Sequence, residues 1–137
     1  MTVPHETAHN SDQSLLEFVE PIAGFPSERT FSLTGIDEAG YFHSLRAVDS
    51  PELRFILSEP VNFFPDYAPK IDQRVLALLG CSDAEDVVFY VILSVAASLV
   101  DATANLRAPI AMSLSTRRAA QIVLDDDALS FREPLAR

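Results

Sequence analysis

The sequence is poor in several residue types on which particular classes of protein depend. Its 137 residues include no tryptophan, one cysteine, four glycines and ten lysine or arginine residues. A single cysteine, Cys81, forms neither an internal disulfide nor a zinc cluster. No P-loop, nucleophile elbow or dinucleotide-binding glycine pattern is present. A disulfide-stabilised scaffold and the common nucleotide-binding motifs are therefore excluded.

The sequence also has few basic residues. The formal net charge is −10, and residues 1–69 hold eleven acidic side chains against three basic ones. Lys70 is the only lysine, and Arg117–Arg118 is the only adjacent basic pair. Proteins that bind nucleic acids or anionic membranes usually present a basic patch. We therefore expect neither of those partners, and a basic protein is the more suitable one.

The sequence also lacks a long hydrophobic run. The most apolar stretch, 87–100, contains two serines and is shorter than the roughly 18–20 residues that a membrane-spanning helix needs. Residues 1–10 lack the basic-then-apolar order of a secretion signal. We therefore expect a soluble protein of the cytoplasm.

Apolar residues are nevertheless plentiful, at 48% of the chain. A chain of this length and composition suits one domain that buries about two thirds of its unfolded surface. Residues 1–13 are polar and lack a periodic pattern, so we interpret them as a flexible N-terminal tail. The domain itself is expected to span residues 14–137.

Short apolar runs alternate with turn residues along most of that domain. In the run 53–57, Leu53, Phe55 and Leu57 share one face, and the run 87–95 has the β-branched and aromatic composition of a buried central strand. Three prolines between Pro60 and Pro69 exclude a helix or a central strand there. We expect strands near residues 15–20, 30–34, 41–48, 53–57, 87–95, 110–114 and 119–124, and a last short one at 129–131.

One segment has a helical pattern. Apolar residues recur at helical spacing from Ile71 to Leu79, Asp72 lies near the positive N-terminal end, and Gly80 follows as a stop. Residues 82–85 resemble a capping box and predict one short turn of helix. The fold class is thus mainly β, a small antiparallel β-barrel-like or sandwich domain with one or two short helices. The charge and the absence of heptads favour a monomer.

No catalytic, cofactor or metal site is predicted. His5 and His9 lie in the tail without further ligands at zinc spacing, and His43 is expected to be solvated or hydrogen-bonded on a strand face. The run Asp125–Asp127 lacks the spaced oxygens and glycine of a calcium loop, so we interpret it as a polar turn. Cys81 has acidic neighbours, which favour an inert thiol.

Two segments are candidate binding elements. Residues 60–67 place Phe63, Phe64 and Tyr67 in a proline-constrained loop, and rigid aromatic side chains are good interface anchors. The alternative is that Phe63 and Tyr67 plug an end of the barrel. Asn105, in the second segment, either contacts a partner or satisfies backbone groups of a neighbouring loop.

Four segments together resemble the FliW family of flagellar assembly factors, from about Phe18 to Leu135. They are the runs 22–25 (IAGF), 60–67 (PVNFFPDY), 103–110 (TANLRAPI) and 121–124 (QIVL), in that order. Ala23 stands where the family commonly has proline, and the run 45–47 replaces its usual Leu-Gln-Ser. The resemblance implies a non-enzymatic β-barrel-like protein that binds flagellin and the translational repressor CsrA, and so relieves repression of flagellin synthesis.

The charge suggests where such a repressor would dock, since CsrA-like proteins carry basic surface. We hypothesise one acidic face contributed by residues 1–69, with Phe64 and Tyr67 as anchors. Its acidic members would be Glu38, Asp49, Glu52, Glu59 and Asp66.

Two other functions remain open at this point. A protein of the same fold with a different partner is one. The other is a metal-dependent hydrolase built on His43 and the run Asp125–Asp127, which would require those groups to converge in one pocket.

Overall fold

The strands follow the alternation of apolar and polar residues along the chain. The computed structural model describes residues 15–95, 97–98 and 101–135, and these ranges contain nine strands, one α-helix and two short 3-10 helices. In chain order they are β1 (Leu15–Glu20), β2 (Thr30–Gly35), β3 (His43–Ala47), β4 (Arg54–Ser58), η1 (Pro60–Asn62), α2 (Gln73–Leu79), η2 (Ala84–Asp86), β5 (Val87–Ser94), β6 (Thr103–Ala104), β7 (Ile110–Ser113), β8 (Arg118–Gln121) and β9 (Glu133–Pro134).

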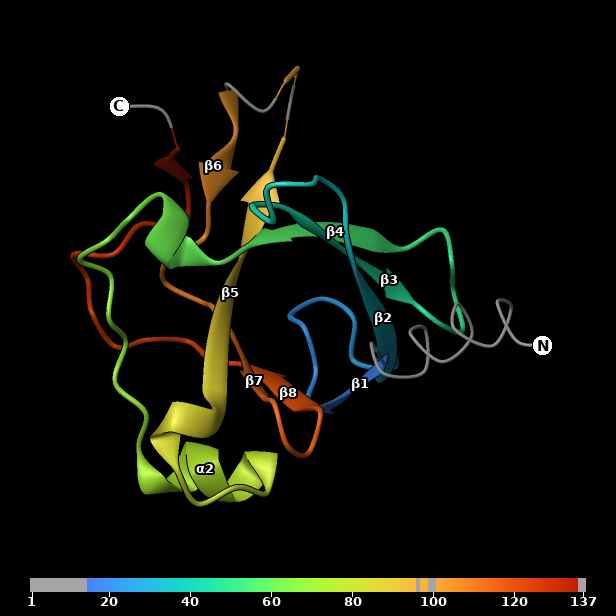
Figure 1. The fold of residues 1–137 in the computed structure, drawn as a ribbon, viewed down its shortest axis with the longest axis vertical. Helices are drawn as coiled ribbons and strands as arrows, with labels where there is room; N and C mark the ends of the chain where they lie inside the picture. Colours follow the sequence, from blue (N-terminus) through green and yellow to red (C-terminus); the bar gives the residue numbers. More distant parts are fainter. Residues whose placement is uncertain (1–14, 96, 99–100, 136–137) are drawn as a thin grey trace.

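Seven of these strands form a closed barrel. They follow the order β4-β3-β2-β1-β8-β7-β5, and the pairing of β4 with β5 closes the ring. Strand β5 is the longest, with eight residues, and Figure 1 shows β4 meeting it at the closure. Strands β6 and β9 extend from β5 outside the ring.

One pairing departs from the expected antiparallel pattern. Strands β1 and β8 run parallel, whereas the other paired strands of the ring are antiparallel. The reason is topological: directions cannot alternate all the way around a ring with an odd number of strands. A closed seven-stranded barrel therefore needs a parallel pair.

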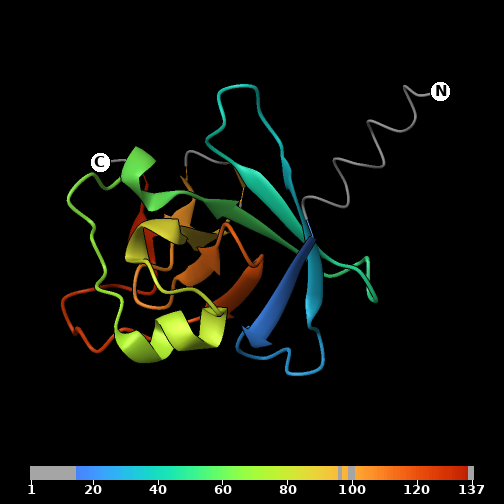
Figure 2. The ribbon, with the colours of Figure 1, turned by 60° about the horizontal axis from the view of Figure 1, so that its bottom comes forward.

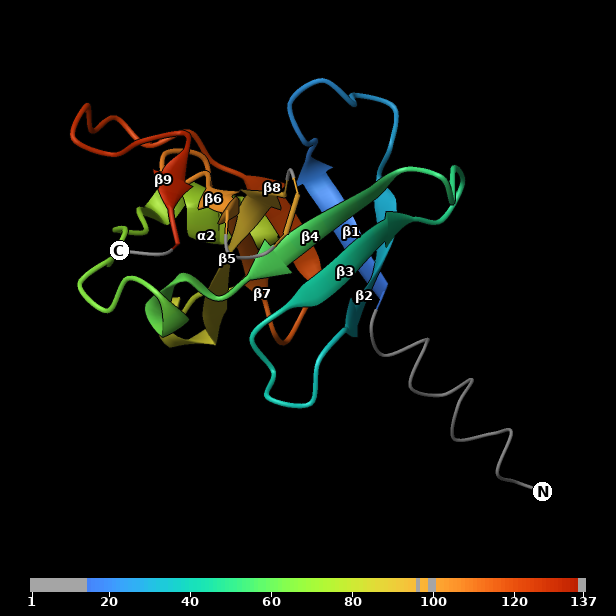
Figure 3. The ribbon, with the colours of Figure 1, turned by 90° about the horizontal axis from the view of Figure 1, so that it is seen from above.

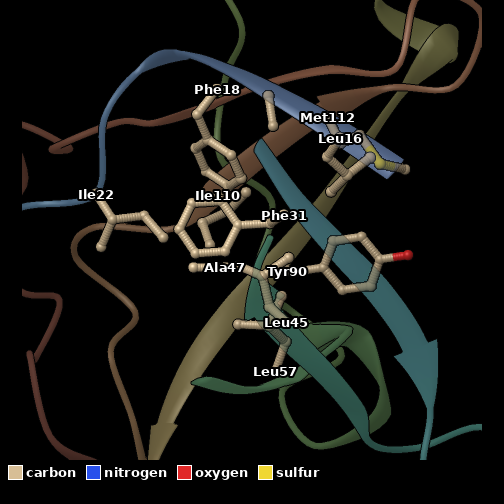
Figure 4. Close-up of a cluster of buried hydrophobic side chains, with 11 residues drawn as sticks. Leu16, Phe18, Ile22, Phe31, Leu45, Ala47, Leu57, Tyr90, Ile110 and Met112 are labelled. Atoms are coloured by element: carbon tan, nitrogen blue, oxygen red, sulfur yellow. The ribbon is translucent and has the colours of Figure 1, made fainter. Parts of the chain in front are cut away.

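The barrel interior holds the main core. Its buried members come from all seven ring strands and from the loop after β1, and Figure 4 shows their side chains converging on one centre. The rings of Phe18 and Phe31 meet edge to face with centroids 5.0 Å apart. Leu57 is buried in this core and Leu53 and Phe55 pack against it, as their shared strand face predicts.

Helix α2 packs on the outside of the barrel wall (Figure 2). Its buried Val75 and Leu79 lie against Ala111 and Ala120, whose small side chains let the helix approach the sheet. Asp72 caps the helix by accepting a hydrogen bond from the Val75 N–H at 3.0 Å. The predicted helix is confirmed, although it begins at Gln73.

Two predicted local features are wrong. The turn of helix η2 is capped by Asp83, which accepts from the Glu85 N–H, and not by the start of the predicted capping box. The last short strand lies at Glu133–Pro134, where it pairs with β6, and not at 129–131. The predicted tail, residues 1–13, lies outside the described residues. Within the described part of the chain, no helix is long and apolar enough to cross a bilayer.

Candidate protein-binding surface

The proline-constrained loop at 60–67 is held in place by buried side chains and by a hydrogen bond. Pro60 begins η1 and is buried, and the Phe64 ring, 5% exposed, packs in a second core cluster on the outside of β5. The Tyr67 hydroxyl donates a hydrogen bond to the Leu106 carbonyl at 2.5 Å. Burial raises the pKa of this phenol above its usual range. Phe64 is therefore part of the core, and only a small part of its ring is left to contact a partner.

Phe63 instead joins an aromatic group at the surface. Its ring lies 5.9 Å from that of Phe42 and 6.1 Å from that of Tyr41, measured between centroids. Asp37 holds the preceding turn by accepting hydrogen bonds from the backbone N–H groups of both Tyr41 and Phe42. Tyr41 is 46% exposed, so this group presents aromatic surface to solvent.

Two clefts meet at Tyr67 and together form what we call the Tyr67 groove. Their volumes are about 470 and 430 Å³, and both are lined by Asp66, Tyr67 and Leu129. Chain segments far apart in the sequence thus share one hollow. The remaining lining residues are Phe63, Phe64, Pro65, Leu106 and Glu133 in the first cleft, and Ala68, Pro69, Lys70, Leu124, Asp125 and Asp126 in the second.

The groove combines an apolar floor with an acidic rim. Four carboxylates and one ammonium group line it, so its charge is negative on balance. Asp127, by contrast, pairs with Arg107 at 2.5 Å, and Arg107 also stacks 5.4 Å from the Phe131 ring centroid. Such a surface suits a basic, amphipathic protein segment.

The acidic residues of the first half do not form one face. Asp49 and Glu52 lie in the turn between β3 and β4, whereas Glu38 lies in the turn between β2 and β3, at the opposite end of β3 (Figure 3). Asp66 lines the Tyr67 groove, and Glu59 lies beside η1. The single acidic face is therefore wrong, because strand reversal sends consecutive turns to opposite ends of the barrel.

Asn105 shapes its own segment, and its side-chain hydrogen bonds to described residues do not reach the neighbouring loop that the sequence suggested. Its Oδ1 accepts hydrogen bonds from the backbone N–H groups of Arg107 and Ala108 at 3.2 and 3.0 Å. These bonds shape the segment that places Leu106 beneath Tyr67. The sequence does not mark Leu106 and Leu129 as groove residues; the available signal is a single leucine two residues after the acidic run Asp125–Asp127.

The candidate chemical groups do not converge. His43 is half-buried, and its ring lies 5.3 Å from that of Tyr90, measured between centroids. Its Nε2 is buried without a hydrogen-bond partner among the described residues, so the expectation of a solvated or hydrogen-bonded group fails for this nitrogen. The Asp126 carboxylate accepts from the Ala128 N–H, as in a polar turn. Within the described ranges, no three His, Cys, Asp or Glu residues are grouped to hold a metal ion.

Comparison with known proteins identifies the family. The model of the FliW protein family matches residues 2–135. The flagellar assembly factor FliW of Symbiobacterium thermophilum is 37% identical over 123 residues, which cover 89% of each chain. The FliW of Caldanaerobacter subterraneus is 30% identical and covers 93% of this chain and 85% of its own. A crystal structure of the flagellar assembly factor FliW superposes with a TM-score of 0.83 at 33% identity, over 92% of this chain and 88% of that one. The chain therefore belongs to the FliW family of flagellar assembly factors.

Proposed function

We infer that this flagellar assembly factor acts without catalysis in the cytoplasm, by binding flagellin and the translational repressor CsrA in alternation. The observation that carries the proposal is the family match over residues 2–135 together with the shared fold. Flagellin that accumulates occupies the factor, and flagellin that leaves the cell frees it to bind CsrA. Free CsrA then falls, and flagellin translation resumes.

We assign flagellin to the Tyr67 groove. The terminal segments of flagellin are helical, and a helix with one apolar face docks in a groove with an apolar floor. The floor residues Leu106 and Leu129 lie beside the Tyr67 ring, which is held in place by its bond to the Leu106 carbonyl. The floor is thus formed before a partner arrives, which lowers the ordering cost of binding.

Isothermal titration calorimetry of this protein against flagellin and CsrA from the same organism tests the proposal. Saturable binding of both, with flagellin displacing CsrA, is the expected result. The absence of heat with either partner, from protein shown to be folded by circular dichroism, would refute the partner assignments while leaving the family unchanged.

A pair of matched variants tests the groove. Leu129→Lys places a charge on the floor and is expected to weaken flagellin binding by about tenfold or more, because buried apolar anchors carry most of an interface's energy. Val123→Lys is the control, since Val123 is 70% exposed and lines neither cleft. Equal affinities for the two variants, both folded, would remove flagellin from this groove.

A further inference from the structure

The barrel wall is open along half of its closing seam. Strand β4 pairs with β5 at three positions only, and the last pair is Ser58 with Val91. The chain then turns away at Pro60, which begins η1 and has no N–H to continue the ladder. Strand β5 extends four residues further, to Val87, so the edge of Val87–Tyr90 that faces away from β7 has no partner strand among the described residues. We call this segment the open half-edge.

The register shows which backbone groups face the open half-edge. The carbonyls of Asp86 and Ile92 accept hydrogen bonds from Leu114 and Asn105, on the β7 and β6 side of the strand. Because alternate residues of an antiparallel strand direct their backbone groups to opposite edges, Phe89 directs its N–H and C=O to the open side.

The neighbours of Phe89 on that edge are at least partly paired. The N–H of Val87 donates to the Ala84 carbonyl of η2, and Val91 pairs with Ser58. No hydrogen bond from the described loops reaches the backbone of Phe89. A donor and an acceptor are thus left together at one point of the edge, where unpaired strand groups are a template for another strand.

The space beside Phe89 has the walls of a shallow binding slot. A cleft of about 160 Å³ lies there, bordered on one side by β5 residues Val88 and Phe89 and on the other by η1 and the segment after it. The walls are mostly apolar and include Val61, which is 57% exposed. Glu59 is the one charged side chain that lines the cleft; it is half-buried, and it forms no ion pair with another described residue.

We propose that the open half-edge is a second docking site, which takes a short extended segment of a basic protein partner by strand addition. The segment's backbone pairs with the N–H and C=O of Phe89, an apolar side chain contacts Val61, and a flanking arginine or lysine pairs with Glu59. Charge complementarity selects the occupant, because an unpaired half-buried carboxylate favours a cation over a neutral or acidic segment. The slot borders the Tyr67 groove, with which it shares Tyr67 and Pro69. The proposal is nevertheless tested independently of the function proposed above, because occupancy of the site is measured without flagellin or CsrA.

Amide hydrogen exchange of the free protein, followed by NMR, gives the first test. The Phe89 amide is expected to exchange faster than those of Val88 and Tyr90, which face β7. Equal protection of all three amides would mean that the edge is already covered, and would overturn the proposal.

Selection from a randomised linear heptapeptide library on the full-length protein gives the second test. Enriched peptides are expected to alternate apolar and polar residues, to carry arginine or lysine, and to protect the Phe89 amide when bound. Methylation of the central backbone nitrogen of such a peptide should weaken binding by about tenfold, because it removes one hydrogen bond of the added strand. If no peptide is enriched, or if the enriched peptides do not protect the Phe89 amide, the edge of β5 does not bind a strand and the proposal is wrong.

Matched charge variants complete the test. Glu59→Gln is expected to weaken the enriched peptide by about fivefold, whereas Glu52→Gln, at the far end of β4, leaves its affinity unchanged. If both substitutions weaken the peptide equally, the peptide is attracted by the overall negative charge of the protein and not by Glu59. If flagellin and CsrA fail to bind while the peptide results stand, the function proposed above fails and this site does not.

Discussion

At the scale of single residues, one carboxylate joins two segments that are distant in the sequence. Asp86, at the end of η2, accepts hydrogen bonds from the Ser113 hydroxyl at 2.5 Å and from the Ser115 N–H and hydroxyl at 3.1 and 2.7 Å. The bond from Ser113 lowers the pKa of Asp86 most, and those from Ser115 lower it further. The ionised form of this side chain therefore stabilises the folded state.

The first prediction follows from that ionisation. Asp86→Asn should lower the thermal midpoint near neutral pH, and its difference from the wild type should shrink in acid. Because the folded-state pKa lies below the ordinary value of 3.8, the contribution is complete above 3.8 and is lost as the pH falls through the folded-state value. Melting curves at neutral and strongly acidic pH measure this. Asp49→Asn, in an exposed turn, is the control, and a difference that persists in acid would contradict the assignment.

A second prediction concerns the phenol that anchors the aromatic loop. Tyr67→Phe should destabilise the protein by about 1–2 kcal/mol in urea unfolding, because the buried Leu106 carbonyl loses its partner. Since burial raises the pKa of Tyr67, its contribution is present below the ordinary value of 10.0 and is lost as the pH rises through the folded-state value. Tyr41→Phe, at an exposed ring, should have little effect; equal losses from the two variants would remove the special role of Tyr67.

At the scale of elements, helix α2 depends on the residue that ends it. Gly80 has a left-handed backbone, with φ of 73°, and its N–H donates to the carbonyls of Ala77 and Leu76. A side chain at this position would place its Cβ 2.9 Å from the Arg118 Nη1, but Arg118 is exposed at that end and can move away. The backbone conformation is therefore the main constraint.

The third prediction uses that constraint. Gly80→Ala should cost about 1–2 kcal/mol of unfolding free energy, since L-residues are disfavoured in the left-handed region, and Gly80→Asn should cost less. Gly35→Ala is the matched control, because Gly35 has no positive φ and no atom within 4 Å of an added Cβ. Chemical denaturation of the three variants measures the effect. A loss at Gly35 as large as that at Gly80 would point to the added methyl group and not to the backbone.

The elements that the sequence predicts are those with signals inside a single segment. Helix α2 is marked by Asp72 and Gly80, and β4 by the alternation of Phe55 and Leu57 with its other residues. Strand β9 has no such signal, because its two residues form a strand only through pairing with β6. Pro60 in the sequence indicates that the pairing of β4 with β5 ends near Ser58. The unpaired edge of β5 also requires that β5 extend beyond the last pair, and this is seen only in the structure.

The sequence likewise predicts those parts of the candidate surface that lie within one segment, and not those that tertiary packing brings together. Local composition identifies the loop around Tyr67, because its aromatic residues and prolines are close together in the sequence. The floor of the groove comes from Leu106 and Leu129, which reach Tyr67 only through tertiary packing. The acidic residues were grouped by their half of the sequence, whereas the β-hairpins place Glu38 and Glu52 at opposite ends of β3.

At the scale of the whole molecule, net charge and local charge have different consequences. A formal charge of −10 attracts any basic partner at long range and speeds encounter, whichever end of the barrel is used. Local charges then decide orientation, and here they differ between the two ends of β4: Glu59 lies beside the aromatic loop and Glu52 lies in the opposite turn. A single acidic face would not separate these two contributions.

The last prediction separates them by stopped-flow association with CsrA, as the proposed partner. Raising the ionic strength from about 0.05 to 0.3 M should slow association of the wild type by about tenfold, because exposed charges are screened within a Debye length. If CsrA docks at the aromatic end, Glu59→Lys should slow association severalfold and flatten its salt dependence, while Glu52→Lys should have a small effect through net charge alone. Each variant changes the net charge by the same amount, so each controls for the other. The reverse ranking would place the repressor at the β3–β4 turn, and association that ignores salt in all three proteins would show that long-range charge does not guide this encounter.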